Sequence, residues 1–203
     1  MAATSQAAHA AVDSSTSESV DLLENLYRMS VDEYERIGEL LDDSRVELVD
    51  GLLLAKMVKN PPHDVACTLS QDALRQVAPA GWHLRMGSPI RIPKHNESEP
   101  DVSLVRGVPR DYRGRHITPR DVALVVEVSD TTLANDRRRV PTYGSAGIPV
   151  YWIVNLLDRK IEVYSGPSSS GYSSRVDFQA GQNIPVVIDG VQVGSITVDD
   201  VLP

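Results

Sequence analysis

The chain has 203 residues, a formal net charge of −8 and a hydrophobic content of 41%. This length and composition suit a single domain with a substantial core. No apolar run is long enough for a membrane span. The acidic balance argues against a general nucleic-acid binder, which must neutralise phosphates. Arginines gather between Arg106 and Arg139, which fits either a local basic face or a solvated loop.

The N-terminal stretch MAATSQAAHAAVDSSTSES lacks the basic start and apolar centre of a secretory signal. Because it is small and polar, we expect residues 1–28 to be a disordered extension of a folded domain at residues 29–203. The single cysteine, Cys67, cannot form an internal disulfide, and we identify no zinc ligands beside it. A reducing, cytoplasmic location fits these features best.

The first predicted elements are a helix and a hairpin. Ser30 and Glu33 form a capping-box pattern that would start the helix. Its apolar stripe would comprise Tyr34, Ile37, Leu40 and Leu41, and the polar residues 42–44 would end it. Asp50-Gly51 is a strong two-residue turn signal between two apolar strands. Alternation in the first strand places Glu47 on the face opposite Leu48, where a solvent-facing position is the ordinary alternative.

Pro61 and Pro62 are predicted to break the chain before a helix over residues 63–77. The buried stripe of this helix would comprise Val65, Ala66, Leu69, Ala73, Leu74 and Val77. His63 falls in its first turn, where a histidine is more often structural than catalytic. Alternating strands are expected at residues 82–86 and 89–93, and a charged loop then leads to Asp101.

The arginine-rich loop over residues 106–120 has the length of a functional or mobile segment. A short helix over residues 133–145 would be distorted by Pro141 and stopped near Gly147. Strands are expected at residues 150–156 and 160–165, with further short strands after them. This order predicts an α/β or α+β fold, in which helices flank one mixed β-sheet and β-hairpins are added.

The most apolar stretch, residues 122–128, has the β-branched composition of a strand buried on both faces. One carboxylate, Glu127, interrupts it near its C-terminal end, and a second, Asp101, stands at the entrance of another apolar strand. A buried charge needs a partner or a metal, and Mg²⁺ prefers oxygen ligands. The two carboxylates are therefore candidates for a divalent-metal site.

Several segments together resemble a known family. They are VELVDG, PPH, EPDVSLV, LVVEVSD, an Asp-Arg-rich helix ending at Tyr143, and AGIPVYWIVN. In this order they resemble the Uma-two family, restriction-endonuclease-like proteins of the PD-(D/E)XK nuclease superfamily. The resemblance runs from Met29 to the C-terminus. It implies a restriction-endonuclease-like core, with a mixed sheet and helices on both sides.

The resemblance also implies the site residues. The two family acids correspond to Asp101 and Glu127, and an additional glutamate corresponds to Glu47. On this basis Asp101, Glu127 and the backbone carbonyl of Val128 would hold Mg²⁺ or Mn²⁺, and the protein would hydrolyse phosphodiester bonds of DNA. The histidine of the PPH segment corresponds to His63, a possible accessory residue.

The chain departs from the superfamily at its lysine. The position two residues after the second acid is Ser129, and the family's lysine position in the following helix is Arg139. Arginine can stabilise charge on a phosphate but cannot act as a general base. Arg137 or Arg138 could point inward instead. A catalytically weakened nuclease-fold protein that binds nucleic acid or a protein partner is therefore the alternative, and sheet edges would allow a homodimer.

Overall fold

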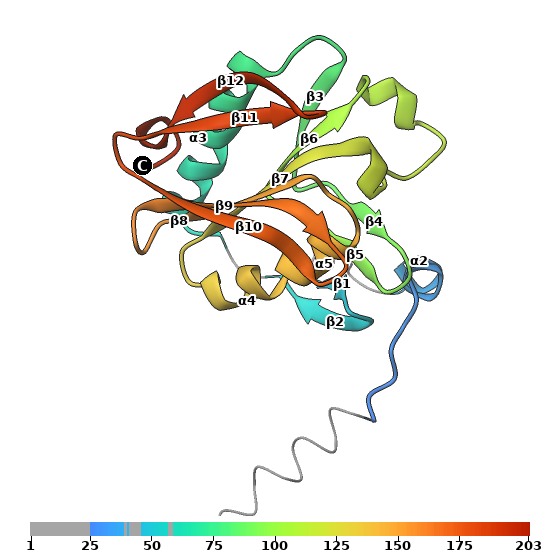
Figure 1. Ribbon diagram of the computed structural model, residues 1–203. Helices are drawn as coiled ribbons and strands as arrows, with labels where there is room; N and C mark the ends of the chain where they lie inside the picture. Colours follow the sequence, from blue (N-terminus) through green and yellow to red (C-terminus); the bar gives the residue numbers. More distant parts are fainter. Residues whose placement is uncertain (1–24, 39, 41–45, 57–58) are drawn as a thin grey trace, which may run out of the picture.

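The computed structural model describes residues 25–38, 40, 46–56 and 59–203, so most of the predicted extension at residues 1–28 lies outside it. Its centre is a six-stranded sheet in the order β10-β9-β8-β7-β6-β3 (Figure 1). The strands are β3 Trp82–Met86, β6 Val102–Arg106, β7 Val122–Ser129, β8 Val150–Asn155, β9 Lys160–Ser168 and β10 Gly171–Gln179. Only the β7–β8 pair within this sheet is parallel. The sheet is therefore mixed, as predicted.

Every residue of β7 is buried, which confirms the prediction of a core strand covered on both faces. On one face, Leu124 and Val126 pack with α3 (Pro61–Val77) and the C-terminal hairpin. On the other face, Val125 packs against Tyr143 of α5 (Val140–Ser145). Successive side chains of a strand point to opposite faces, so Glu127 faces the α5 side with Val125.

A smaller four-stranded sheet has the order β2-β1-β5-β4. Its strands are β1 Val46–Val49, β2 Leu52–Ala55, β4 Ile90–Ile92 and β5 Asn96–Ser98. Asp50 and Gly51 have φ angles of 48° and 78°, the left-handed values that a tight hairpin turn between β1 and β2 requires. A third sheet pairs β11 (Asn183–Ile188) with β12 (Val191–Thr197). This hairpin covers α3 (Figure 1).

The helix predicted from Ser30 is α2, Val31–Gly38, and its capping box is confirmed. Glu33 N–H lies 3.3 Å from Ser30 Oγ, and Ser30 N–H donates to Glu33 Oε2 at 2.8 Å. The helix ends at Gly38, so Leu40 is not part of its stripe and is 85% exposed. The predicted positions at residues 41–44 lie outside the described residues.

The prediction that the two prolines break the chain before α3 is wrong. Pro61 and Pro62 are its first two residues, where a missing N–H costs nothing. Asn60 caps this end, its side chain accepting from His63 N–H at 3.1 Å. The buried stripe is also rotated from the predicted one, because Val65 is exposed whereas Cys67 is buried.

The helix predicted at residues 133–145 is two helices, α4 (Leu133–Arg138) and α5, which meet at Arg139. Pro141 lies in the first turn of α5, so the expected distortion is confirmed. The connection over residues 106–120 contains a 3₁₀ turn at Pro109–Tyr112 and leads into another at Pro119–Asp121. Within the described residues, no helix is long and apolar enough to cross a membrane.

Candidate active site

Asp101 and Glu127, the two acids that the sequence singles out as metal-ligand candidates, lie side by side. Strands β6 and β7 are antiparallel neighbours with Val102 opposite Val126, which puts Asp101 beside Glu127. Asp101 N–H donates to Glu127 Oε2 at 3.2 Å. Val128 N–H donates to Asp101 Oδ2 at 2.9 Å. Main-chain groups thus hold both carboxylates at the same end of the sheet.

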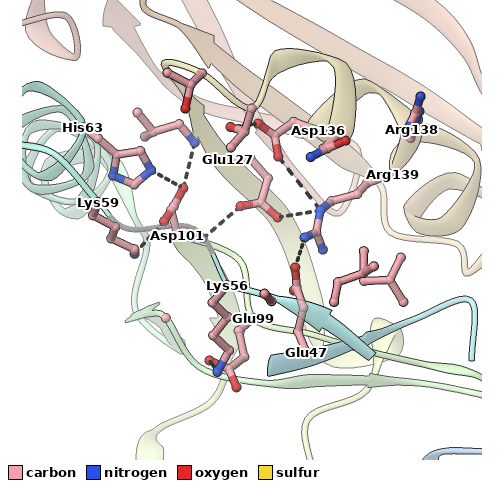
Figure 2. A pocket seen from close by; sticks show the side chains of 18 of the residues that line it. Glu47, Lys56, Lys59, His63, Glu99, Asp101, Glu127, Asp136, Arg138 and Arg139 are labelled. Atoms are coloured by element: carbon pink, nitrogen blue, oxygen red, sulfur yellow. Dashed lines mark hydrogen bonds and ion pairs between the residues drawn. The ribbon is translucent and has the colours of Figure 1, made fainter. Parts of the chain in front are cut away.

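Two side chains at the N-terminal end of α3 contact the carboxylate of Asp101: Lys59, which precedes the helix, and His63, in its first turn. Lys59 Nζ lies 2.7 Å from Asp101 Oδ1, and His63 Nε2 lies 3.2 Å from Oδ2 (Figure 2). Burial by itself would raise the pKa of Asp101, but the hydrogen bond from His63 and the charge of Lys59 lower it to about 2. Asp101 is therefore an anion at neutral pH.

Glu127 is in a different environment, although its carboxylate accepts a hydrogen bond from the backbone N–H of Asp101. It is buried, and Tyr143 donates its hydroxyl to Glu127 Oε1 at 2.9 Å. Burial raises the pKa of Glu127 well above its usual value. Arg139, 4.0 Å away, opposes this shift, whereas the negative charge of Asp101 adds to it. Negative charge on Glu127 is therefore costly without a compensating cation.

Glu47 projects from β1 into the same site, and its partner is Arg139. The Arg139 Nη2 group donates to Glu47 Oε1, and Nε lies 3.9 Å from Asp136 Oδ1. Burial by itself would lower the pKa of Arg139, but Glu127 and the neighbouring groups raise it further above its usual value. The guanidinium is thus a fixed positive charge among carboxylates.

Among the three consecutive arginines, the structure selects Arg139 as the inward one. Arg137 pairs instead with buried Glu162 on β9, and Arg138 is exposed at the pocket mouth. Arg139 lies between α4 and α5, and the change of direction there turns its side chain toward β1.

Among the residues that sequence reasoning missed, Lys59 and Asp136 contact the predicted site residues directly. Lys59 precedes the prolines of α3, and nothing local indicated that it would meet an acid 42 positions away. Asp136 of α4 is buried and accepts from Ser129 Oγ at 2.5 Å and Thr132 Oγ1 at 2.6 Å. Burial raises its pKa. Its spacing of three residues from Arg139 was the one available signal, because such residues share a helix face.

These groups line a pocket of about 540 Å³ (Figure 2). Its carboxylates are Glu47, Asp50, Glu99, Asp101, Glu127, Asp130 and Asp136, and its cations are Arg28, Lys56, Lys59, Arg138 and Arg139. No described residue of the arginine-rich segment 106–120 lines it. Arg106 and Arg115 of that segment form ion pairs with Asp189 and Asp121. The cations at the pocket come from elsewhere in the chain.

A mixed sheet flanked by helices, with acids from two adjacent strands meeting at one end, defines a protein of the restriction-endonuclease-like class. Residues 31–198 match the model of the Uma2 family, described as "Putative restriction endonuclease", and the chain belongs to this family. The family resemblance seen in the sequence is therefore confirmed. Family membership supports a nuclease-like function in general terms.

A solved structure is similar in fold. It is a crystal structure of "a putative nuclease belonging to DUF820" from Anabaena variabilis ATCC 29413. The TM-score is 0.67, and the match covers 85% of this chain and 97% of that chain. At 14% sequence identity the similarity concerns the fold alone. No curated protein matches the chain.

Proposed function

We propose that the protein is a divalent-metal-dependent endonuclease that hydrolyses phosphodiester bonds of DNA. The observation that carries this proposal is the contact between Asp101 and Glu127 at the pocket, where Glu47 and Asp136 add two further carboxylates. Such an oxygen-rich, negative site is what Mg²⁺ or Mn²⁺ prefers. Family membership supports the nuclease part of the proposal.

The residues present fit a divalent ion. Asp101, Glu127 and the backbone carbonyl of Val128 would hold it, and all three residues line the pocket. The pKa of Glu127 is raised by burial and then by neighbouring acids, so a cation would relieve an excess of negative charge. When bound, the ion would polarise the phosphate and make water a better nucleophile.

Two protein cations would act on the phosphate. Arg139 would stabilise charge that develops on its oxygens, because a guanidinium stays protonated and offers several donors. Lys59 would supply the ammonium group that is absent at Ser129. Its side chain is 51% exposed while Nζ touches Asp101, so it can reach both the acid and a bound phosphate. Neither cation is required to act as a base.

Cleavage of plasmid and single-stranded DNA in Mg²⁺ or Mn²⁺ tests the proposal. We expect wild type to cleave, EDTA to stop cleavage, and Asp101→Asn and Glu127→Gln to be inactive. Asp72→Asn is the matched control, because Asp72 is an exposed α3 carboxylate paired with Arg75, and it should retain full activity. Activity that survives in Asp101→Asn would disprove the assignment.

Lys59→Met tests whether Lys59 contributes to the cleavage rate in addition to Arg139. We expect a fall in rate of about 100-fold, since the loss of one donor to a charged transition state has this size. Lys160→Met is the control, because Lys160 pairs with Asp177 and does not line the pocket. An unchanged rate in Lys59→Met would leave Arg139 as the phosphate-binding cation.

One observation favours the alternative of a nuclease-fold binding protein. Arg139 and Lys59 already neutralise Glu47 and Asp101 without a metal. If wild type cleaves nothing, DNA binding that is lost in Arg138→Met and Lys59→Met would support this function. Binding unchanged by both substitutions would argue against the pocket as the nucleic-acid site.

A homodimer is also part of the proposal. Strand β2 is at the edge of its sheet, and its Leu53 and Leu54 are 37% and 43% exposed. An exposed apolar edge strand can pair with a second copy. Light scattering should give twice the monomer mass, and Leu53→Lys should shift the protein to monomer. A monomeric wild type at high concentration would refute this part.

A further inference from the structure

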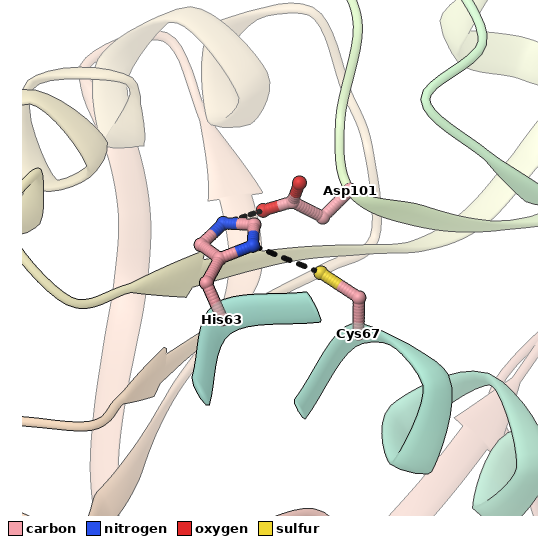
Figure 3. Close-up of side chains that lie close together, drawn as sticks. All are labelled: His63, Cys67 and Asp101. Carbon is pink, nitrogen blue, oxygen red and sulfur yellow. Dashed lines mark hydrogen bonds and ion pairs between the residues drawn. The ribbon is translucent and has the colours of Figure 1, made fainter. Parts of the chain in front are cut away.

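Cys67, the single cysteine of the chain, lies against the proposed active site. Its Sγ is 3.4 Å from His63 Nδ1, and His63 Nε2 is 3.2 Å from Asp101 Oδ2 (Figure 3). His63 and Cys67 are four residues apart on α3 and therefore share one face of the helix. The prediction that Cys67 has no neighbouring zinc ligands is wrong. The four-residue spacing in the sequence places His63 beside Cys67 on one helix. Asp101 comes close to them only through the tertiary fold.

The order thiol, imidazole, carboxylate also resembles a cysteine-nucleophile arrangement. Two observations argue against this chemistry. Cys67 is 2% exposed and does not line the pocket, so a substrate does not reach its sulfur. Burial, reinforced by the charge of Asp101, raises the pKa of the thiol far above its usual value. A reactive cysteine needs access and a lowered pKa.

The same three groups suit a metal of a different class from Mg²⁺. One ligand atom from each residue lies within 4.8 Å of the other two. A thiolate, an imidazole nitrogen and a carboxylate oxygen are ligands of Zn²⁺ and similar ions, whereas Mg²⁺ takes oxygen almost exclusively. On binding, the ion would displace the proton of the Cys67 thiol, and the resulting thiolate and the Asp101 carboxylate together would balance the charge of a divalent ion.

We propose that His63, Cys67 and Asp101 form a binding site for a soft or borderline divalent ion such as Zn²⁺ or Cd²⁺. The ion would enter through the pocket, which His63 and Asp101 line, and would reach Cys67 behind them. Water would complete a tetrahedral set, as in open three-ligand zinc sites. The site does not depend on the proposed nuclease activity.

The site has a consequence for the hard-ion site because the two share Asp101. A soft ion held by Cys67 and His63 would draw the Asp101 carboxylate toward α3. That carboxylate is then less available to an ion between β6 and β7. Zn²⁺ would accordingly compete with Mg²⁺, and the protein would respond to the balance of the two ions.

Cd²⁺ titration of the reduced, full-length protein tests the site without nucleic acid. Thiolate coordination to Cd²⁺ produces an ultraviolet charge-transfer band, and the single cysteine makes its origin unambiguous. We expect a band that saturates at one ion per chain and disappears in Cys67→Ser. Affinity should fall about 10-fold or more in His63→Gln and Asp101→Asn. Asp72→Asn, an exposed acid on the same helix, should match wild type.

Two outcomes would overturn the proposal. One is the absence of a band in wild type. The other is a band whose affinity is unchanged in both His63→Gln and Asp101→Asn, which would mean binding to the thiol alone. Circular dichroism melting of each variant verifies that it is folded. Because no DNA is present, failure of this site is separable from failure of the nuclease proposal.

Discussion

Arg139 links the stability of the protein to its proposed metal site, and Arg139→Met tests this link. The substitution keeps most of the apolar stem but removes the charge between Glu47, Glu127 and Asp136. Removing one partner of a buried ion pair costs about 3–5 kcal/mol, because the other charge stays buried and uncompensated. The side chains of Arg139 and Glu47 are 14% and 11% exposed, so we expect the lower end, about 3 kcal/mol.

In a domain of this length, 1 kcal/mol shifts the melting temperature by about 2–4 °C. Arg139→Met should therefore melt about 6–12 °C below wild type at pH 7 in EDTA. The exposed neighbour gives a matched control, since Arg138→Met should stay within about 0.5 kcal/mol of wild type. Adding Glu47→Gln to Arg139→Met should recover part of the loss, because it removes one of the uncompensated charges.

Divalent ions provide the decisive arm of this experiment. If Arg139 neutralises carboxylates that a bound metal would otherwise neutralise, Mn²⁺ should raise the melting temperature of Arg139→Met more than that of wild type. A melting temperature of Arg139→Met equal to wild type in EDTA would refute the buried ion pair. Equal stabilisation of both proteins by Mn²⁺ would refute competition between the guanidinium and the ion.

Two further predictions concern stability away from the pocket. A Cβ at Gly144 of α5 would overlap the backbone carbonyl of Gly171, so Gly144→Ala should cost about 3 kcal/mol in urea unfolding, whereas Gly114→Ala, with no atom within 4 Å, should cost under about 0.5 kcal/mol. Equal stability of the two variants would contradict this packing. The hydrogen bond from Arg115 lowers the pKa of Asp121 to about 2, so the stability it adds is present above about pH 4 and is lost as the pH falls toward 2. Arg115 is half exposed, so Asp121→Asn should cost only about 1 kcal/mol at pH 6, and its difference from wild type should shrink toward zero as the pH falls through about 2; a pH-independent difference would count against the assigned pKa.

Local patterns predicted much of the fold because their interactions join residues close in the chain. The capping box at Ser30 and the turn at Asp50-Gly51 each depend on a few adjacent positions. Predictions failed where a local signal had two meanings. Proline ends a helix interior but is favoured in the first turn, and α3 uses it in the second way.

The candidate site could be predicted only in part. Asp101 and Glu127 were identifiable because a carboxylate in an apolar stretch is unusual in any fold. Asp101 and Glu127 meet because their strands, β6 and β7, are neighbours in the sheet. By contrast, the His63–Cys67–Asp101 cluster needed the position of α3 on the sheet, which no local pattern specifies.

The sequence by itself determined the core strand β7, its buried glutamate and the family to which the chain belongs, since apolar runs and short motifs are local properties. Tertiary structure alone decided which cations meet the acids. Lys59 reaches Asp101 across 42 positions, and Arg139 reaches Glu47 across 92. These pairings depend on strand register and on the bend between α4 and α5, which set where side chains point once the core is packed.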